Sequence, residues 1–316
     1  MKAVEDMMVS ICCITYNHEK YIRDALESFV KQKTTFNFEI LIHDDASTDK
    51  TPQIIREYQR KYPNIIKPIY QTENQYSKNK KITLTYQFPR ACGKYIAMCE
   101  GDDYWCDDNK LQKQFEKMEN NEDISLCVHD TICKNYRNNT ENNFGSYTED
   151  TILAFRKYLR DYLKSEPKTL FQTSSFFFRR KYIDELVGEN IPQFFIKCPV
   201  GDIPLVFLLG TKGKIYYSTE IMSVYRCDIP GSWTNSSKGS DKTKQMQEFY
   251  KLFNEYSKLR YNEEMKEFVS LLDFYMDIQE KKYKEIMKKD YYKFLRKQPW
   301  KTRVYVFLKA YFSKDK

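Results

Sequence analysis

Adjacent carboxylates in the middle of this 316-residue chain are spaced in a way that suits cation binding. Asp102 and Asp103 end the segment Glu100-Gly101-Asp102-Asp103, which directly follows an apolar run. Two neighbouring acids repel each other unless a cation or hydrogen-bond donors compensate them, and hard oxygen ligands of this kind favour Mg²⁺ or Mn²⁺. The alternative interpretation is a solvated turn whose acids cap the helix near Lys110. The pair is a candidate metal site.

A second acidic cluster begins with Asp44 and Asp45 and runs to Asp49. A carboxylate at this position could accept the imide hydrogen of a uracil-type base. The polar side chains of residues 47–49 are suited to capping the helix that starts near Pro52, a role for which Asp44 and Asp45 are not needed.

Two further segments carry polar groups next to apolar runs. Thr15-Tyr16-Asn17 ends the first run, where the Tyr16 ring could stack on a nucleobase while Asn17 caps the following helix. Asp202 precedes the apolar run Pro204 to Leu209 and is either a helix N-cap or an active-site carboxylate.

Alternating apolar runs and helix-like spacing predict the elements that position these residues. We expect strands at residues 8–14, 38–42, 65–70, 95–99, 124–128 and 170–178. We expect helices at residues 21–30, 51–58, 83–91 and 204–209, a loop at 135–143, and long Lys-rich helices from 241 onward. This order is typical of an α/β fold with a mainly parallel sheet flanked by helices. Ligands bind beyond the carboxyl ends of such strands, where the acidic clusters lie.

Composition limits the cellular setting. Nine cysteines without paired metal-ligand spacing or a compact disulfide framework favour a reducing compartment. Neither a secretory signal nor an apolar run of membrane-spanning length is evident, so we expect a cytoplasmic protein.

The net charge of +8 is concentrated toward the C-terminus. Residues 283–316 interleave Lys and Arg with aromatic residues, which suits peripheral contact with an anionic membrane on its inner face. A solvated amphipathic helix that packs on the rest of the protein explains the same pattern. Nucleic acid is not expected, since no recognised binding module accompanies the basic residues.

Taken together, these segments resemble the family-two inverting glycosyltransferases of the GT-A fold. The resemblance runs from about Val9 to about Trp233 through VSICCITYN, YIRDALESFVKQ, EILIHDDASTDKT, ACGKYIAMCEGDDYW, KLQKQ, GDIPL, KGKIYY, MSVYR and GSW. It implies a GT-A catalytic domain over residues 1–240, with a nucleotide-sugar-binding half at about 1–125 and an acceptor-binding half at 126–240. A helical, basic extension would follow at 241–316.

The resemblance also implies roles for single residues. In the donor site, Tyr16 stacks on the base within the turn of Thr15 and Asn17, and Asp45 contacts the base with Asp44 beside it.

Around the reacting groups, Asp102 lies near the ribose, Asp103 binds Mn²⁺ or Mg²⁺, and Asp202 is the catalytic base. His129 lines the acceptor side. Arg226 or Trp233 closes over the donor; a plain strand and surface turn are the alternative for that segment.

The implied activity is metal-dependent, inverting transfer of a hexose from a nucleoside-diphosphate sugar, a UDP-sugar by preference, to a glycan or lipid-linked acceptor in bacterial surface polysaccharide assembly. The late motif is Gly201-Asp202 where many members have Glu-Asp, and a Gln/Arg/Trp signature is missing, so processive synthesis is not expected. Two other classes stay open. One is a sugar nucleotidyltransferase, although its glycine-rich phosphate loop is missing; the other is a non-catalytic membrane-surface or glycan-binding protein with a degenerate transferase fold.

Overall fold

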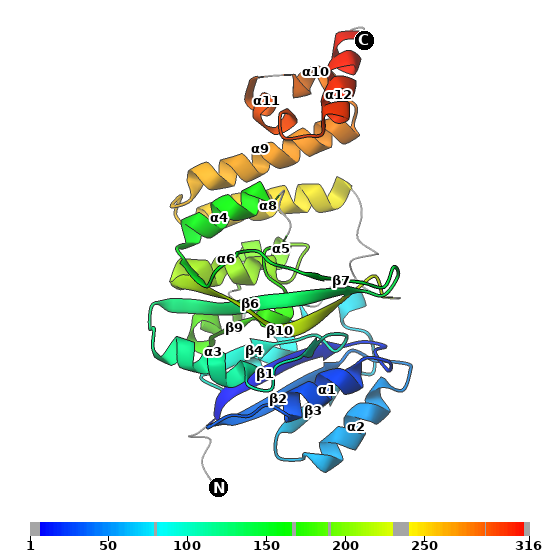
Figure 1. Cartoon of the computed structure of the whole chain (residues 1–316), viewed down its shortest axis with the longest axis vertical. Helices are drawn as coiled ribbons and strands as arrows, with labels where there is room; N and C mark the ends of the chain where they lie inside the picture. The colour runs from blue at the N-terminus through cyan, green and yellow to red at the C-terminus, as the bar shows by residue number, and fades with distance from the viewer. Residues whose placement is uncertain are drawn as a thin grey trace. The chain divides into compact units, whose positions relative to one another are not determined.

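The computed structural model describes residues 7–78, 81–165, 169–188, 191–229, 240–287 and 289–312. These residues form two compact units (Figure 1). The first comprises residues 1–192 and 200–236, and the second comprises residues 193–199 and 237–316. Within the described residues, no helix combines the length and apolarity that crossing a bilayer demands.

A mixed sheet forms the centre of the first unit. Its strands are β1 (Met7–Thr15), β2 (Asn37–Asp44), β3 (Ile66–Tyr70), β4 (Tyr95–Met98), β5 (Tyr104–Trp105), β6 (Ile124–Asn135), β7 (Thr140–Asn143), β8 (Thr151–Leu153), β9 (Phe177–Arg179) and β10 (Lys214–Cys227). The spatial order is β3-β2-β1-β4-β9-β6-β10-β5, with β7 paired to β6 and β8 to β10. Strands β3, β2, β1 and β4 run parallel, as do β6 and β10, while β9 is antiparallel to both of its neighbours.

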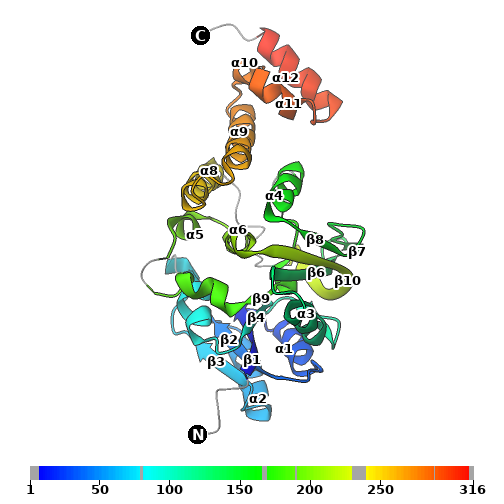
Figure 2. The same ribbon diagram turned by 90° about the vertical axis from the view of Figure 1, so that its left-hand side faces the viewer.

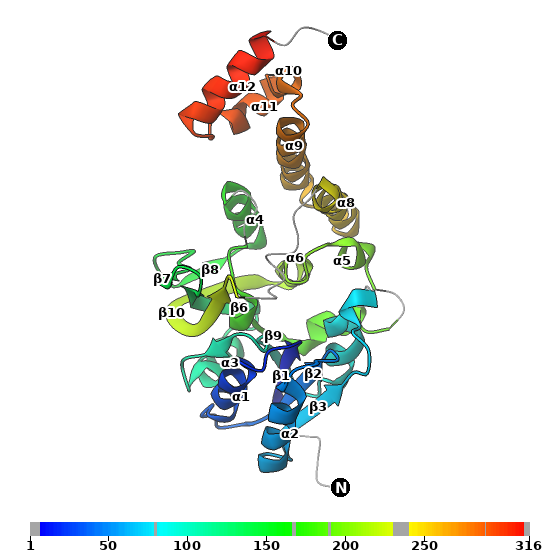
Figure 3. The same ribbon diagram turned by 90° about the vertical axis from the view of Figure 1, so that its right-hand side faces the viewer.

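Helices and short turns flank this sheet. The helices are α1 (Ile22–Val30), α2 (Thr51–Lys61), α3 (Lys110–Glu119), α4 (Phe155–Lys164) and α6 (Ile203–Lys212). Figures 2 and 3 show α1 and α2 on one face of the β1–β3 strands and the turns of residues 83–90 on the other. This placement follows from right-handed crossovers, because the chain steps from β1 to β2 to β3 in one direction across the sheet and returns from β3 to β4 in the other.

The apolar patterns explain these elements. Strand β1 is central and buried on both faces, so it reads as a continuous apolar run and not as an alternating one. Helix α1 buries Ile22, Ala25, Leu26 and Phe29, which recur at helical spacing and pack against the sheet. The predicted fold class, a largely parallel α/β sheet with C-terminal helices, is confirmed.

Three local predictions were wrong in detail. Residues 83–91 form a π turn (Thr83–Gln87) and a 3-10 turn (Phe88–Arg90) in place of a regular helix, with Pro89 in the second turn. Of residues 170–178, only Phe177 and Phe178 lie in a strand, because Thr173–Ser175 form a 3-10 turn in which the Ser175 hydroxyl donates to the Gln172 carbonyl at 2.7 Å. The expected loop at 135–143 contains the end of β6 and all of β7.

The second unit is helical. It contains α5 (Gln193–Lys197), α8 (Ser240–Tyr256), α9 (Asn262–Gln279), α10 (Tyr283–Ile286), α11 (Lys289–Leu295) and α12 (Trp300–Phe312). Stacked aromatic residues hold it together, for example Tyr250 of α8 and Phe268 of α9, whose ring centroids lie 4.6 Å apart. The long helices expected from residue 241 onward are therefore present, in several pieces.

Candidate functional site

The loops after β1 and β2 are joined by side-chain hydrogen bonds. Asn17 adopts a left-handed backbone conformation (φ 55°), its N–H donates to the Ser47 hydroxyl at 2.8 Å, and its side-chain oxygen accepts the Thr48 N–H at 2.8 Å. The expectation that Asn17 caps the next helix was wrong, since α1 begins only at Ile22. Tyr16 lies directly before Asn17 and is 43% exposed.

Asp44 and Asp45 lie at the end of β2 and are almost completely buried. Asp44 accepts a hydrogen bond from the Ser47 hydroxyl at 2.5 Å, and burial raises the pKa of its carboxyl group. The Asp45 carboxylate accepts the backbone N–H groups of Gln75 and Tyr76, at 2.8 Å and 3.0 Å. Asp45 therefore fixes the loop that follows β3 against the end of β2.

The turn after β4 approaches the end of β1 so closely that only glycine fits at position 101. A Cβ atom on Gly101 would lie 2.6 Å from the Thr15 hydroxyl oxygen and 2.9 Å from Cδ1 of Ile22. Thr15 is itself buried, and its carbonyl oxygen accepts the Asp45 N–H at 3.0 Å. Thr15 thus joins the two acidic loops.

Three carboxylates follow β4 at this point. Asp103 is buried and accepts the backbone N–H of Arg226 at 2.9 Å. Asp102 is more exposed, and its carboxylate lies 3.8 Å from Nε2 of His18. Burial and the charges of Asp102 and Glu100 raise the pKa of Asp103 well above its ordinary value. The turn therefore concentrates negative charge.

A fourth carboxylate, that of Asp202, comes from a distant segment of the chain. It is the N-cap of α6, where its carboxylate accepts the N–H of Ile203 at 2.9 Å. Burial, together with the charges of Asp102 and Asp202, raises the pKa of Glu100 to about 8. The N-terminus of α6 therefore faces the same region as the turn after β4. The two interpretations of Asp202, helix cap and site carboxylate, are compatible.

Arg226 contacts the acidic turn of residues 100–103 and is held by several polar contacts. Its guanidinium is buried, donates to the Asp102 carbonyl oxygen at 2.6 Å, and forms an ion pair with Asp24. It also donates to the Tyr136 hydroxyl at 3.2 Å and lies 4.5 Å from the ring centroid of Tyr104. These contacts hold Arg226 within β10 as a support of the turn. Trp233, the other residue expected to close over a donor, lies outside the described residues.

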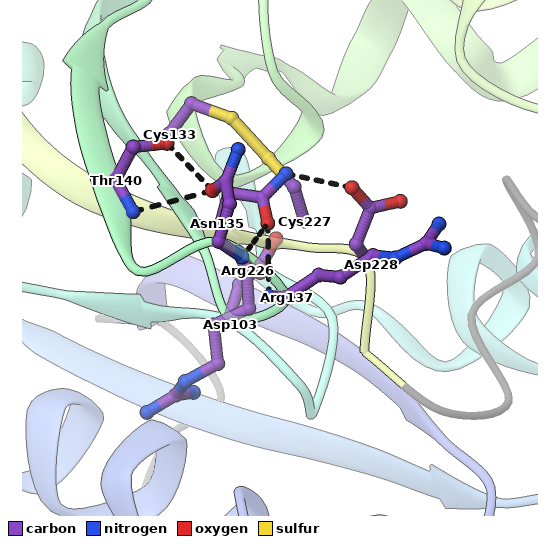
Figure 4. The surroundings of a disulfide bond; sticks show 9 residues. Asp103, Cys133, Asn135, Arg137, Thr140, Arg226, Cys227 and Asp228 are labelled. Carbon is purple, nitrogen blue, oxygen red and sulfur yellow. Dashed lines mark hydrogen bonds between the residues drawn. A yellow bond between two sulfur atoms is a disulfide. The ribbon is translucent and has the colours of Figure 1, made fainter.

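The residue after Arg226, Cys227, forms a disulfide bond, as Figure 4 shows. Cys133 of β6 is bonded to Cys227 of β10, directly after Arg226. Beside it, the Asn135 side chain donates to the Asp228 carboxylate at 2.6 Å. Sequence reasoning missed this bond because 94 residues separate the two cysteines and nothing local marks the pair. It also missed Asp24 and Glu100 as members of the site. Glu100 could have been found, because it belongs to the same acidic segment as Asp102 and Asp103.

His129 lies inside β6, which continues to Asn135. It is buried, with Nδ1 2.8 Å from the Asp130 carbonyl oxygen. Burial and the nearby charge of Lys110 lower its pKa well below the usual value, so the ring is neutral. Its role on the acceptor side stays a prediction.

The donor set at the acidic turn fits a divalent cation that is shared with a diphosphate. In the described parts of the chain, no three His, Cys, Asp or Glu side chains are grouped to hold a metal ion alone. Mg²⁺ bound with a phosphate-containing substrate needs only one or two protein carboxylates, because phosphates and waters supply the remaining ligands. Asp102 and Asp103 supply hard oxygens, and the pKa of Asp103 is raised first by burial and then by the charges of Asp102 and Glu100, which a bound cation would offset.

The chain is similar to known proteins over the segments that form this site. The family model described as Glycosyl transferase family 2 matches residues 10–187. An uncharacterized protein of Mycobacterium tuberculosis is 35% identical over 231 residues, which cover 71% of this chain and 60% of that protein. This chain thus spans less than two thirds of the relative's length.

Two further similarities are to a protein with a named biosynthetic role and to a structure that contains a ligand. The minor teichoic acid biosynthesis protein GgaA of Bacillus subtilis is 31% identical over 123 residues, which cover 38% of this chain and 27% of GgaA. The structure of S. aureus TarS 1–349 in complex with UDP-GlcNAc superimposes with a TM-score of 0.61 at 15% identity, covering 96% of this chain and 88% of that one. At such low identity the likeness to TarS bears on the fold alone.

Proposed function

This chain belongs to glycosyl transferase family 2, and on that premise we propose that it is an inverting hexosyltransferase. Its donor is a nucleoside-diphosphate sugar, with UDP as the favoured nucleotide, and its acceptor is a hydroxyl group of a glycan or a lipid-linked glycan. The similarity to GgaA supports a product in cell-surface polymer assembly. TarS shares the fold and was solved with UDP-GlcNAc, which makes UDP the first nucleotide to test.

One observation supports the assignment of the reacting groups above all others. The charge of Asp202, from the N-terminus of α6, raises the pKa of Glu100 at the end of β4. Transfer requires the base and the diphosphate-binding turn to lie close together, and the electrostatic coupling between Asp202 and Glu100 supports this arrangement.

The residues divide the chemistry as follows. Tyr16 stacks on the base, and Asp45 accepts its imide hydrogen while keeping its loop contacts, since a carboxylate has about four lone-pair sites. Asp102 binds the ribose. A divalent cation on Asp103, Mn²⁺ or Mg²⁺, would neutralise charge on the leaving diphosphate.

Asp202 acts on the acceptor. Its carboxylate removes the proton of the acceptor hydroxyl group. At the same time the acceptor oxygen forms a bond to the anomeric carbon, and the bond between this carbon and the diphosphate oxygen breaks. The in-line displacement inverts the anomeric centre. The N–H of Ile203 at the start of α6 holds the Asp202 carboxylate in position.

The test combines donor binding and turnover. Asp202→Asn should lower transfer by about a hundredfold to ten-thousandfold, the usual contribution of a general base, while the melting temperature still rises with nucleotide and Mn²⁺. Asp103→Ala should lose the metal-dependent part of that rise. Asp184→Asn is the matched control, because Asp184 is exposed and pairs only with the Arg180 side chain at 3.5 Å among the described contacts. Wild-type turnover in Asp202→Asn would refute the role of the base.

If no nucleoside diphosphate stabilises the wild-type protein at about millimolar concentration, with or without Mn²⁺, a degenerate, non-catalytic member of the family becomes the better description.

A further inference from the structure

The outer face of α12 carries a row of exposed apolar side chains. They are Trp300, Val304, Phe307, Leu308 and Tyr311, and each is between 47% and 75% exposed. At about 100° per residue, these five positions fall within an arc of roughly 100° on one side of the helix. We call them the outer stripe.

The inner face of α12 already has its packing partners. Val306 and Ala310 are buried; Val306 lies about 150° around the helix from the centre of the outer stripe, and Ala310 about 110°. Tyr305 holds the helix to α10, since its hydroxyl oxygen lies 3.3 Å from that of Tyr283 and the two rings pack edge to face. These contacts involve side chains outside the outer stripe, whose five members are largely exposed.

The charges around the outer stripe select one kind of partner. Residues 291–312 contain six Lys and Arg and no Asp or Glu. Lys301 and Arg303 are exposed and fall on the two edges of the stripe at the helical spacing. Basic side chains can keep their charged ends in the headgroup layer while their stems cover apolar surface. Trp and Tyr combine an apolar ring with a polar edge and concentrate at that layer.

We propose that α12 docks on an anionic lipid bilayer, with the outer stripe in the interfacial layer and Lys301 and Arg303 on the headgroups. A helix of 13 residues with an apolar arc and basic edges lies in the plane of such an interface. Docking places the chain beside lipid-linked acceptors, and it does so through residues that take no part in the transfer reaction. A failure to bind vesicles would therefore leave the assignment of Asp202 untouched.

The test uses the full chain and vesicles of phosphatidylcholine, with or without about one third phosphatidylglycerol. The wild type should sediment with the anionic vesicles and much less with the neutral ones. The triple variant Trp300→Gln, Phe307→Gln, Tyr311→Gln should bind at least roughly tenfold more weakly, since it removes most of the exposed aromatic surface. Ile196→Gln, a change at another exposed apolar residue of the second unit, should bind like the wild type.

A charge variant separates the two contributions. Lys301→Gln with Arg303→Gln should weaken binding to anionic vesicles by roughly 30-fold at low salt and leave the weak neutral binding unchanged. The emission of Trp300 should shift to shorter wavelength on anionic vesicles, and Trp300→Phe should remove the shift but not the binding.

Three outcomes would overturn the proposal. One is equal binding of the wild type to neutral and anionic vesicles, or binding to neither. Another is full binding by the triple variant while its circular dichroism matches the wild type. The third is a wild-type dimer that the triple variant converts to a monomer without any vesicle binding, which would make a second copy of the chain the occupant of the stripe.

Discussion

Replacing Lys110 with methionine should stabilise this protein at neutral pH. Lys110 lies in α3, is completely buried, and has no hydrogen-bond partner for its amino group among the residues that the structure describes. Its amino nitrogen lies 4.0 Å from the ring centroid of Trp105. Burial lowers the pKa of Lys110 from 10.5 to about 7, which means that the fold disfavours the charged form.

The pKa difference sets the size of the effect. Each pKa unit corresponds to about 1.4 kcal/mol, so the folded state loses roughly 3–5 kcal/mol at about pH 7 relative to an unperturbed lysine. Met fills a similar volume and keeps a favourable contact with the indole ring. Allowing for the lost cation–π contact, we expect Lys110→Met to gain roughly 2–3 kcal/mol and to melt roughly 4–12 °C higher.

The pH dependence gives the sharper assay. The folded pKa lies below the unfolded one, so between about pH 7 and 10.5 the unfolded chain holds a proton that the folded chain has released. Raising the pH through this window stabilises the wild type, and that gain is absent at about pH 7. The advantage of Lys110→Met, measured by urea unfolding with circular dichroism, should therefore shrink by roughly 3 kcal/mol and vanish by about pH 9.5.

The control lies one turn away on the same helix. Lys113 is 40% exposed at its side chain and pairs with Asp107 and Glu220. Lys113→Met should cost at most about 1 kcal/mol, with no trend over the same pH window. If Lys110→Met is destabilising at both pH values, or if its advantage does not depend on pH, the reasoning about this buried amine is refuted.

Two further predictions concern the supports of the site. Gly101→Ala should cost roughly 1–3 kcal/mol, measured as a lower melting temperature, because its Cβ would approach the Thr15 hydroxyl oxygen to 2.6 Å; an unchanged melting temperature would contradict the close packing of this turn. Reducing the Cys133–Cys227 bond should cost up to about 5 kcal/mol, since it closes a loop over a separation of 94 residues. The double serine variant should melt like the reduced wild type and be insensitive to reductant, whereas identical melting of the oxidised and reduced wild type would show that the bond contributes nothing.

The fold and the position of the acidic loops could be predicted because the signals are local. The buried strand β1 and the amphipathic helix α1 read directly as apolar patterns over about ten residues each. Asp44 ends β2 and Asp102 follows β4, and both strands pair in parallel with β1. The two residues therefore lie at the same edge of the sheet, where the carboxyl ends of the parallel strands meet.

The contacts of the site residues could not be predicted, because they join segments far apart in the chain. Arg226 pairs with Asp24 across 202 residues, and the Asp45 carboxylate is used by backbone groups 30 and 31 residues later. Asn17 carries a side chain suited to capping, and its actual partner was set by the packing of another loop. The residue type of Asn17 correctly indicated that its side chain would accept a hydrogen bond, but the partner was determined by tertiary structure.

The division of the chain into units has a consequence for its synthesis. Phe194 of α5 is buried in the second unit, where its ring lies 5.3 Å from that of Phe253 and 4.8 Å from that of Tyr256 in α8. Those partners leave the ribosome roughly 60 residues later, a delay of about 3–12 s at 5–20 residues per second. During this interval the newly made chain presents a short aromatic segment without its partners, which is the kind of segment that molecular chaperones bind. A fragment that ends at residue 236 would stay in that state permanently, so we expect the first unit to be most soluble when all three crossings between the units are left intact.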